Sequence, residues 1–178
     1  MTDTDTKTAQ GSPFWRFSLQ FYRQPAVADA CIALQEQSGV DVNLLLFLLW
    51  QATRQRTFSP DEVATLEARI GPWREATVVP LRAVRRALKS PPALVAPATA
   101  EAFRTRIKAV ELEAERLQQE AMYELARGDA PLGKPTSPPA EAARLSVAAY
   151  AAMRAVAFPE PAVETLLAAF TTLHGRGE

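Results

Sequence analysis

The sequence predicts an all-α fold: a compact multi-helix domain with one long heptad-patterned helix, then a proline-rich linker and a helical tail. Apolar residues recur at spacings of three and four in most segments, which is the period of an amphipathic helix. Serine, aspartate or proline precedes several of these segments, as is usual at helix N-termini. No segment shows the convincing apolar–polar alternation that is typical of a strand.

A run of large apolar residues, 44–50, marks the centre of the predicted fold. A helix that is apolar on every side must be surrounded by protein or by lipid. Spanning a bilayer takes about 20 apolar residues, and this run is closed by Gln51 and Arg54. We therefore expect it to be the central helix of a helical core, and we expect no membrane segment.

The composition favours a single globular domain with an ordinary core and excludes several classes of site. The chain has 178 residues, 48% of them apolar, and 20 Lys plus Arg balance 20 Asp plus Glu. Zero net charge argues against a protein built mainly to hold nucleic acid. With one cysteine, Cys31, and one histidine, His174, neither an internal disulfide nor a Cys/His zinc site can form. We expect no metal and no cofactor, and we expect Cys31 to be a small buried hydrophobe rather than a nucleophile.

The N-terminal residues 1–11 are polar and lack the apolar region of a signal peptide. We expect them to be disordered, and we expect a cytoplasmic protein. The predicted domain limits are 1–11 for the disordered N-terminus, 12–127 for the helical core, 128–139 for the Pro/Gly linker and 140–178 for the helical tail.

Cap residues delimit the first two predicted helices. Ser12 followed by Pro13 starts the first helix, and three phenylalanines between residues 14 and 21 share one of its faces. Pro25 opens the second helix, and Gly39 is a natural stop after it.

The third and fourth helices have stronger start signals. Asp41 caps the third helix, which contains the apolar run. Ser59 is followed by proline and by Glu62 at the capping-box position, which is a complete helix start. Gly71–Pro72 is expected to end this fourth helix and to start the fifth.

The fifth helix, 73–89, contains Pro80, which lacks a backbone N–H. A kink or break near Val78–Val79 is expected, with a short strand at Thr77–Val79 as the weaker alternative. The longest helix follows at 99–127 and carries a heptad-like apolar seam. Two further helices are expected at 140–157 and 161–173.

Several blocks together resemble one family. They are FWxFSLxFY at 14–22, DVNLLLF at 41–47, WR at 73–74 and VPLR at 79–82. Together, in this order, they resemble a family of short proteobacterial proteins, which is classified as a domain of unknown function. The resemblance covers about residues 14–127. It implies a bacterial, cytoplasmic, mostly helical protein and attaches no activity to it.

Two polar residues at the start of the most apolar helix form the first candidate site. Asp41 and Asn43 lie within one turn of each other. They could present a carboxylate and an amide to a ligand between helices. The alternative is that Asp41 caps the helix and Asn43 bonds a neighbouring loop, because a buried helix end needs such partners.

A basic stripe forms the second candidate site. Arg82, Arg85, Arg86 and Lys89 share one side of a helix, and Arg74 adds to them. Such a stripe fits phosphate groups, RNA or an acidic partner surface. The alternative is a solvated helix face with cations near the C-terminus.

The aromatic residues near the N-terminus are mostly expected to be core. Trp15 and Tyr22, seven residues apart, are the two expected to stay partly exposed, as a protein-contact surface or as a platform for stacking bases. The apolar seam of the longest helix can pack against other helices of the same chain. Alternatively, it can pack against a second copy of the chain and form a homodimer. The seam residues named for a homodimer are Phe103, Ile107, Val110 and Leu117.

Three functions follow from these candidates. The favoured one is a non-catalytic cytoplasmic adaptor or regulatory protein that binds another protein through the basic stripe. The second is an enzyme, or a binder of a phosphorylated or lipid ligand, with a pocket bordered by Asp41, Asn43 and Arg82. The third is an RNA-binding accessory protein. A concave pocket at these three residues would favour the second function, and outward-pointing arginines over a solid core would favour the first. We assign no catalytic residues, because no Ser-His-Asp set or glycine-rich phosphate loop is apparent.

Overall fold

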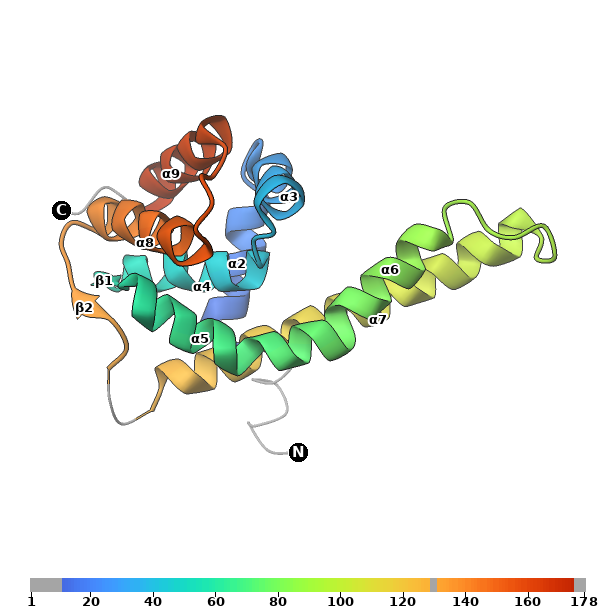
Figure 1. Cartoon of the computed structure of the whole chain (residues 1–178), viewed down its shortest axis with the longest axis horizontal. Helices are drawn as coiled ribbons and strands as arrows, with labels where there is room; N and C mark the ends of the chain where they lie inside the picture. The colour runs from blue at the N-terminus through green and yellow to red at the C-terminus, as the bar shows by residue number, and fades with distance from the viewer. Residues whose placement is uncertain (1–10, 129–130, 175–178) are drawn as a thin grey trace.

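The computed structural model describes residues 11–128 and 131–174, and most of these residues are helical, which confirms the all-α class (Figure 1). The helices form a compact body from which one helical hairpin projects. The expected disorder of residues 1–11 falls almost wholly outside the described residues.

The first two helices cover one side of the body. Helix α2 (Pro13–Tyr22) begins at Ser12, whose side chain accepts a hydrogen bond from the Trp15 N–H, and its phenylalanines are buried. Helix α3 (Val27–Ser38) buries Cys31 completely and ends at Gly39, which adopts a left-handed conformation. Both boundaries follow from the capping chemistry.

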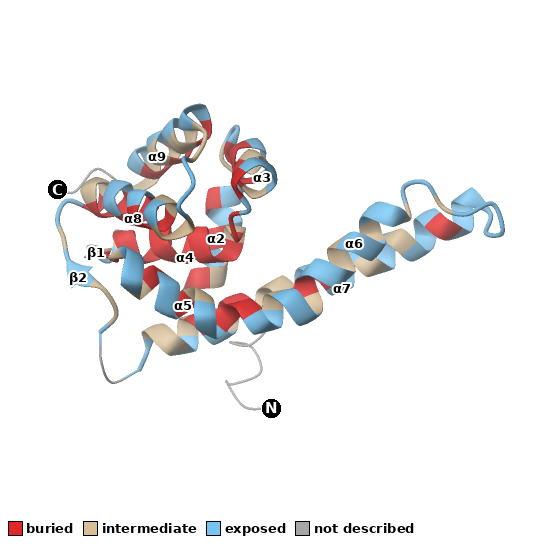
Figure 2. Ribbon diagram, in the orientation of Figure 1, coloured by how far each residue is buried: buried red, intermediate tan, exposed pale blue. Residues whose placement is uncertain are grey.

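Helix α4 (Val42–Thr53) is the centre of the body. Its residues from Asn43 to Ala52 are all buried (Figure 2). Helices α2, α3, α7 and α8 all contact it. The apolar run is therefore covered by protein on every side. Among residues 11–128 and 131–174, no helix has the length and hydropathy needed to cross a bilayer.

The next segment stays helical where an interruption was expected. Helix α5 (Pro60–Trp73) starts with the predicted capping box and runs through Pro72, so the expected end at Gly71–Pro72 is wrong. A helix can carry proline when tertiary packing offsets the lost hydrogen bond and the clash. A π-helical turn η1 (Arg74–Val78) then leads into α6 (Val79–Ala87), in place of the alternative strand near Val78. The expected irregularity before Pro80 thus takes the form of one wide turn.

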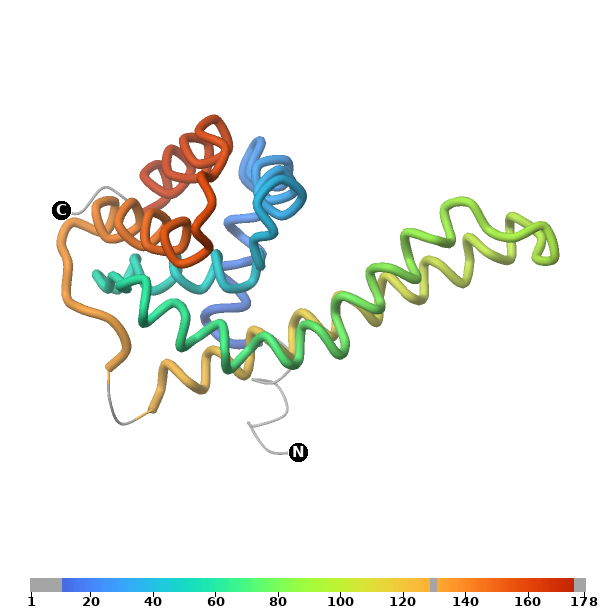
Figure 3. Tube along the Cα trace, in the orientation of Figure 1, coloured from blue at the N-terminus to red at the C-terminus, as the bar shows by residue number. Residues whose placement is uncertain are grey.

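Helix α7 (Pro97–Ala126) is the longest element and returns alongside α6. The trace in Figure 3 shows the two helices leaving the body together as an arm, with the loop 88–96 at its tip. The proximal half of α7 lies under the body and contacts α2 and α4. The arm is thus continuous with the core through both of its helices.

The C-terminal segment belongs to the same core. Two-residue strands β1 (Arg56–Thr57) and β2 (Lys134–Pro135) pair antiparallel and tie the segment after α7 to the body. Helix α8 (Pro139–Arg154) packs along α4, and α9 (Glu160–His174) packs against α3 and α8. Residues expected as a helical tail therefore pack in the core beside those from the 12–127 segment.

Candidate functional site

A groove of about 920 Å³ lies between the α2–α3 side of the body and the base of the α6–α7 arm. Its lining comes from α2, α3, the start of α4, η1, α6, α7 and the end of α8. All nine candidate residues of the sequence line it, although they are up to 74 residues apart in the chain. The fold therefore brings the acidic, basic and aromatic candidates to one place.

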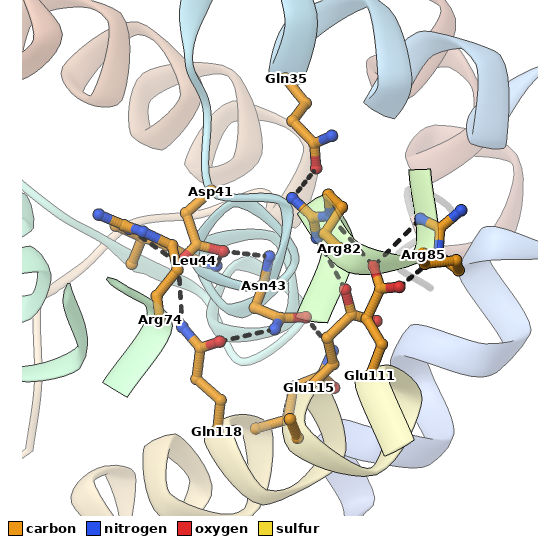
Figure 4. Close-up of polar contacts among 12 residues, drawn as sticks. Gln35, Asp41, Asn43, Leu44, Arg74, Arg82, Arg85, Glu111, Glu115 and Gln118 are labelled. Carbon is orange, nitrogen blue, oxygen red and sulfur yellow. Dashed lines mark hydrogen bonds and ion pairs between the residues drawn. The ribbon is translucent and has the colours of Figure 1, made fainter. Parts of the chain in front are cut away.

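The floor of the groove is a chain of buried side-chain hydrogen bonds (Figure 4). Asn43 Nδ2 donates to Gln118 Oε1 at 2.9 Å, and Gln118 Nε2 donates to Asp41 Oδ2 at 2.9 Å. Gln119 Nε2 donates to Asn43 Oδ1 at 2.8 Å. Asn43 therefore binds helix α7 rather than a neighbouring loop. The amide oxygen Gln119 Oε1 is buried and has no hydrogen-bond partner among the described residues.

Asp41 is a helix cap that several elements share. Its Oδ1 accepts from the backbone N–H groups of Asn43 and Leu44 at 2.8 and 3.4 Å. Its own N–H donates to the hydroxyl of Tyr150 at 2.9 Å, which links α4 to α8. Burial raises the pKa of this tyrosine above its usual value, so the hydroxyl stays neutral.

Arg74 crosses from the end of α5 to the cap of α4. Its Nη1 donates to Asp41 Oδ2 at 2.9 Å, and the same guanidinium binds the carboxylate of Glu67. The hydrogen bond to Glu67 is the main cause of a raised pKa for Arg74. Both carboxylate oxygens of Asp41 thus accept hydrogen bonds from other groups of the chain. This assigns Asp41 and Arg74 a structural role in the groove floor.

The basic stripe divides into a paired half and an open half. Arg82 Nε and Nη2 bind Glu111 and Glu115 of α7 at 3.1 and 2.9 Å, and its Nη1 donates to Gln35 at 2.8 Å. Arg85 also binds Glu111. The sequence analysis singled out the cations and did not identify these two glutamates as candidates. The sequence signal that could have identified them is their spacing of four residues, which places both carboxylates on one helical face.

The two glutamates differ in protonation chemistry. Burial alone would raise the pKa of Glu111, but the hydrogen bonds and charges of Arg85 and Arg82 outweigh it and the pKa is lowered. For Glu115, burial and the nearby Glu111 carboxylate outweigh Arg82, and the pKa is raised. The groove therefore holds one carboxylate that is firmly ionised and one that takes up a proton more readily than usual.

Cations without a strong internal partner lie at the arm end of the groove. Arg86 approaches Glu36 at 3.3 Å, with both side chains about half exposed. Within residues 11–128 and 131–174, Lys89 and Lys108 form no ion pair. Seven cations and five acids line the groove in total, so its charge is positive and the excess lies toward the arm.

Half-exposed apolar side chains stand on both walls of the groove. Leu19, Tyr22 and Ile32 line the body side, and Val79 and Leu112 line the arm side. Trp15 is partly exposed, as expected, while Phe14, Phe17 and Phe21 are buried in the core. The groove therefore combines apolar walls with a basic open end.

The remaining reactive groups lie away from the groove. Burial raises the pKa of the Cys31 thiol to about 12, and His174 packs on Phe17 and Phe170. In the part of the chain that the structure describes, His, Cys, Asp and Glu side chains do not gather into a set that could hold a metal ion.

One comparison with known proteins supports the expected membership of a family of unknown function. The model of the family described as "Protein of unknown function (DUF2390)" matches residues 13–122. No curated protein and no solved structure matches the chain. The matched residues include the start of α4, α6 and most of α7. Because the family model covers more than half of the chain, the protein belongs to this family.

Proposed function

We propose that the protein is a non-catalytic, bacterial, cytoplasmic adaptor that binds an acidic, amphipathic segment of a partner protein in the groove. The observation that carries the proposal is the lining of the groove. Apolar side chains stand on both walls, and cations are in excess at the arm end. A helix or extended segment with apolar residues on one side and carboxylates on the other is complementary to such a surface.

The internal ion pairs favour a polypeptide over a small phosphorylated ligand. A phosphate group needs cations that are free to bind it, commonly arginine in bidentate geometry. Arg74, Arg82 and Arg85 already bind carboxylates of the chain. A small anion at the floor would have to displace these bonds, whereas a longer partner reaches Arg86, Lys89 and Lys108 at the rim.

A double charge reversal tests the proposal. In R86E/K89E the excess of cations at the open end is lost, while the pairs of Arg82 and Arg85 with α7 are kept. The matched control is R69E/R144E, because Arg69 and Arg144 are exposed cations outside the groove. Partners are captured from lysate by each variant and identified by mass spectrometry. Peptides tiled over a captured protein are then measured by fluorescence anisotropy.

An acidic peptide should bind the wild type and the control equally. We expect its Kd to rise at least about tenfold in R86E/K89E and to rise with NaCl, because the contact is electrostatic at the rim. L112D should weaken binding similarly by placing a carboxylate on the apolar wall. Equal affinity of all four proteins for every tiled peptide would contradict the proposal.

A small-ligand site or enzyme is the second candidate, and one observation favours it. A concave groove at Asp41, Asn43 and Arg82 is the feature expected for this candidate, and Arg82 and Arg85 bind Glu111 instead of pointing to solvent as expected for the adaptor. The groove also contains Glu115, a carboxylate with a raised pKa. Such a residue is suited to general acid–base chemistry. A higher unfolding midpoint in millimolar inorganic phosphate, abolished by R82Q, would support this candidate over the adaptor.

A further inference from the structure

One face of α7 carries a row of three large apolar side chains that are about half exposed, and the first of them, Phe103, also borders a pocket beside the 88–96 loop. Phe103, Val110 and Leu117 are 47%, 52% and 45% exposed, and they are seven residues apart. Seven residues are close to two helical turns, so the three side chains lie in line along one side of the helix over about 21 Å. Ile107, the fourth residue named for the predicted seam, differs because it is half-buried.

The row is separate from the groove. Leu112 lines the groove, and it is rotated by about 200° around the helix from Val110. Trp73, which is 40% exposed and does not line the groove, extends the apolar surface beside Leu117, since its indole N–H donates to the carbonyl of Ala114 at 3.0 Å. An exposed tryptophan and a regular apolar row are features of a protein interface.

The charges along α7 are asymmetric. Residues 102–110 contain three cations and no acid, whereas residues 111–124 contain five glutamates and one arginine. Next to the row, Arg106 follows Phe103 by three residues, and Glu113 follows Val110 by three, so both lie on the same flank. Within the described part of the chain Arg106 forms no ion pair, and Glu113 binds only Arg116 on the surface.

We propose that the row is a self-association surface on which two copies of α7 pair antiparallel about a twofold axis at Val110. In this register Phe103 faces the partner's Leu117, and Val110 faces the partner's Val110. Antiparallel twofold symmetry brings the same flank of both helices together. Arg106 therefore faces the partner's Glu113, and the pair occurs twice. A parallel pair would bring opposite flanks together and leave Arg106 without this carboxylate.

The size of the row sets the strength of the contact. A standard stable interface buries about 800 Å² on each partner, and three half-exposed side chains with their flanks supply less. The dimer is therefore reversible, with a Kd on the order of 10 µM. Sedimentation velocity of the full chain, from about 1 to 200 µM, should show a monomer–dimer equilibrium.

Substitutions on opposite faces of α7 test the surface. V110D should raise the dimer Kd at least about tenfold by burying two carboxylates at the axis, while the matched variant L112D should leave it unchanged. L112D should instead weaken peptide binding in the groove, so failure of the dimer and failure of the proposed function are distinguishable. A monomer at every concentration, or equal dimerisation of V110D and L112D with native circular dichroism, would overturn the proposal.

Charge exchange and cross-linking test the register. R106E and E113R should each weaken the dimer severalfold, and R106E/E113R should restore it to within about threefold of the wild type. V110C should form a disulfide-linked dimer under mild oxidation, F103C and L112C should not, and Cys31 is too buried to interfere. Efficient cross-linking of F103C, or no rescue by the double reversal, would exclude the antiparallel arrangement.

Discussion

Two glutamates one turn apart on α7 show how strongly residue surroundings differ within the groove. Glu111 is enclosed by Arg82 and Arg85, and Glu115 shares Arg82 while being close to the carboxylate of Glu111. Burial favours the protonated form of both carboxyls, and only around Glu111 do the arginines outweigh it, so the pKa of Glu111 is lowered and that of Glu115 is raised. The pH dependence of stability should separate the two residues.

At pH 7 we expect E111Q to lose about 2 kcal/mol of unfolding free energy, because two arginines lose their charged partner. The folded-state pKa of Glu111 lies below its unfolded value, so its contribution is present above the unfolded pKa and is lost as pH falls through the folded pKa. The difference between E111Q and the wild type should therefore close on acidification. Urea denaturation over a pH series measures it.

Glu115 behaves oppositely, because its folded pKa lies above the unfolded value. As pH rises from the unfolded pKa through the folded one, this group lowers stability, since the folded state binds the proton more tightly. At pH 7 E115Q should therefore cost clearly less than E111Q, or even stabilise the protein. Equal losses in the two variants would contradict the assigned surroundings.

At the scale of the element, helix ends were encoded locally and were predicted well. The serine caps of α2 and α5, the aspartate cap of α4 and the glycine end of α3 lie where expected. Each depends on groups within four residues of the boundary. The wrong end at Gly71–Pro72 arose because tertiary packing on α7 and α8 outweighs the local proline signal.

The ends of α3 and α8 give a prediction at this scale. Gly39 and Ala155 both adopt left-handed backbone, at φ 62° and 52°. G39A should destabilise by about 1 kcal/mol or more through strain, and its Cβ would lie 2.6 Å from Arg154 Nη2. A155G should stabilise by about 1 kcal/mol, because glycine adopts this conformation without strain.

Thermal unfolding of both variants checks this. G71A is the control, because Gly71 lies inside α5 and an added Cβ would make only ordinary van der Waals contacts, at 3.7 Å from Arg74 Nη2 and 3.9 Å from Glu67 Oε1. Alanine there should stabilise by a similar amount. The account is contradicted if G39A is as stable as the wild type or if A155G lowers the unfolding midpoint.

At the scale of the whole molecule, α8 and α9 complete the core even though the family match ends at residue 122. Val147, Tyr150, Leu166 and Phe170 are buried against helices of the N-terminal segment. Removing them would expose an apolar face of α4 and leave the Asp41 N–H without its tyrosine partner. Both changes would lower the free energy of unfolding substantially.

We therefore expect a chain ending at residue 128 to lack cooperative unfolding. Circular dichroism during urea titration should show a broad, weak transition, whereas the full chain should show a sharp one. Y150F is a milder companion that should fold and lose about 1–2 kcal/mol. A cooperative transition of the truncated chain at the midpoint of the full chain would contradict this prediction.

The helices, most of their ends and the buried hub at 44–50 could be predicted from the chain alone, because periodicity and capping are properties of short segments. The nine candidate residues were named from their chemistry and spacing. The folded arrangement was needed to see that Arg82 and Arg85 bind Glu111, that the candidates share one groove, and that Phe103, Val110 and Leu117 stay about half exposed. These features depend on which faces of distant helices meet. That choice is set by packing over the whole core and leaves no local signal in the chain.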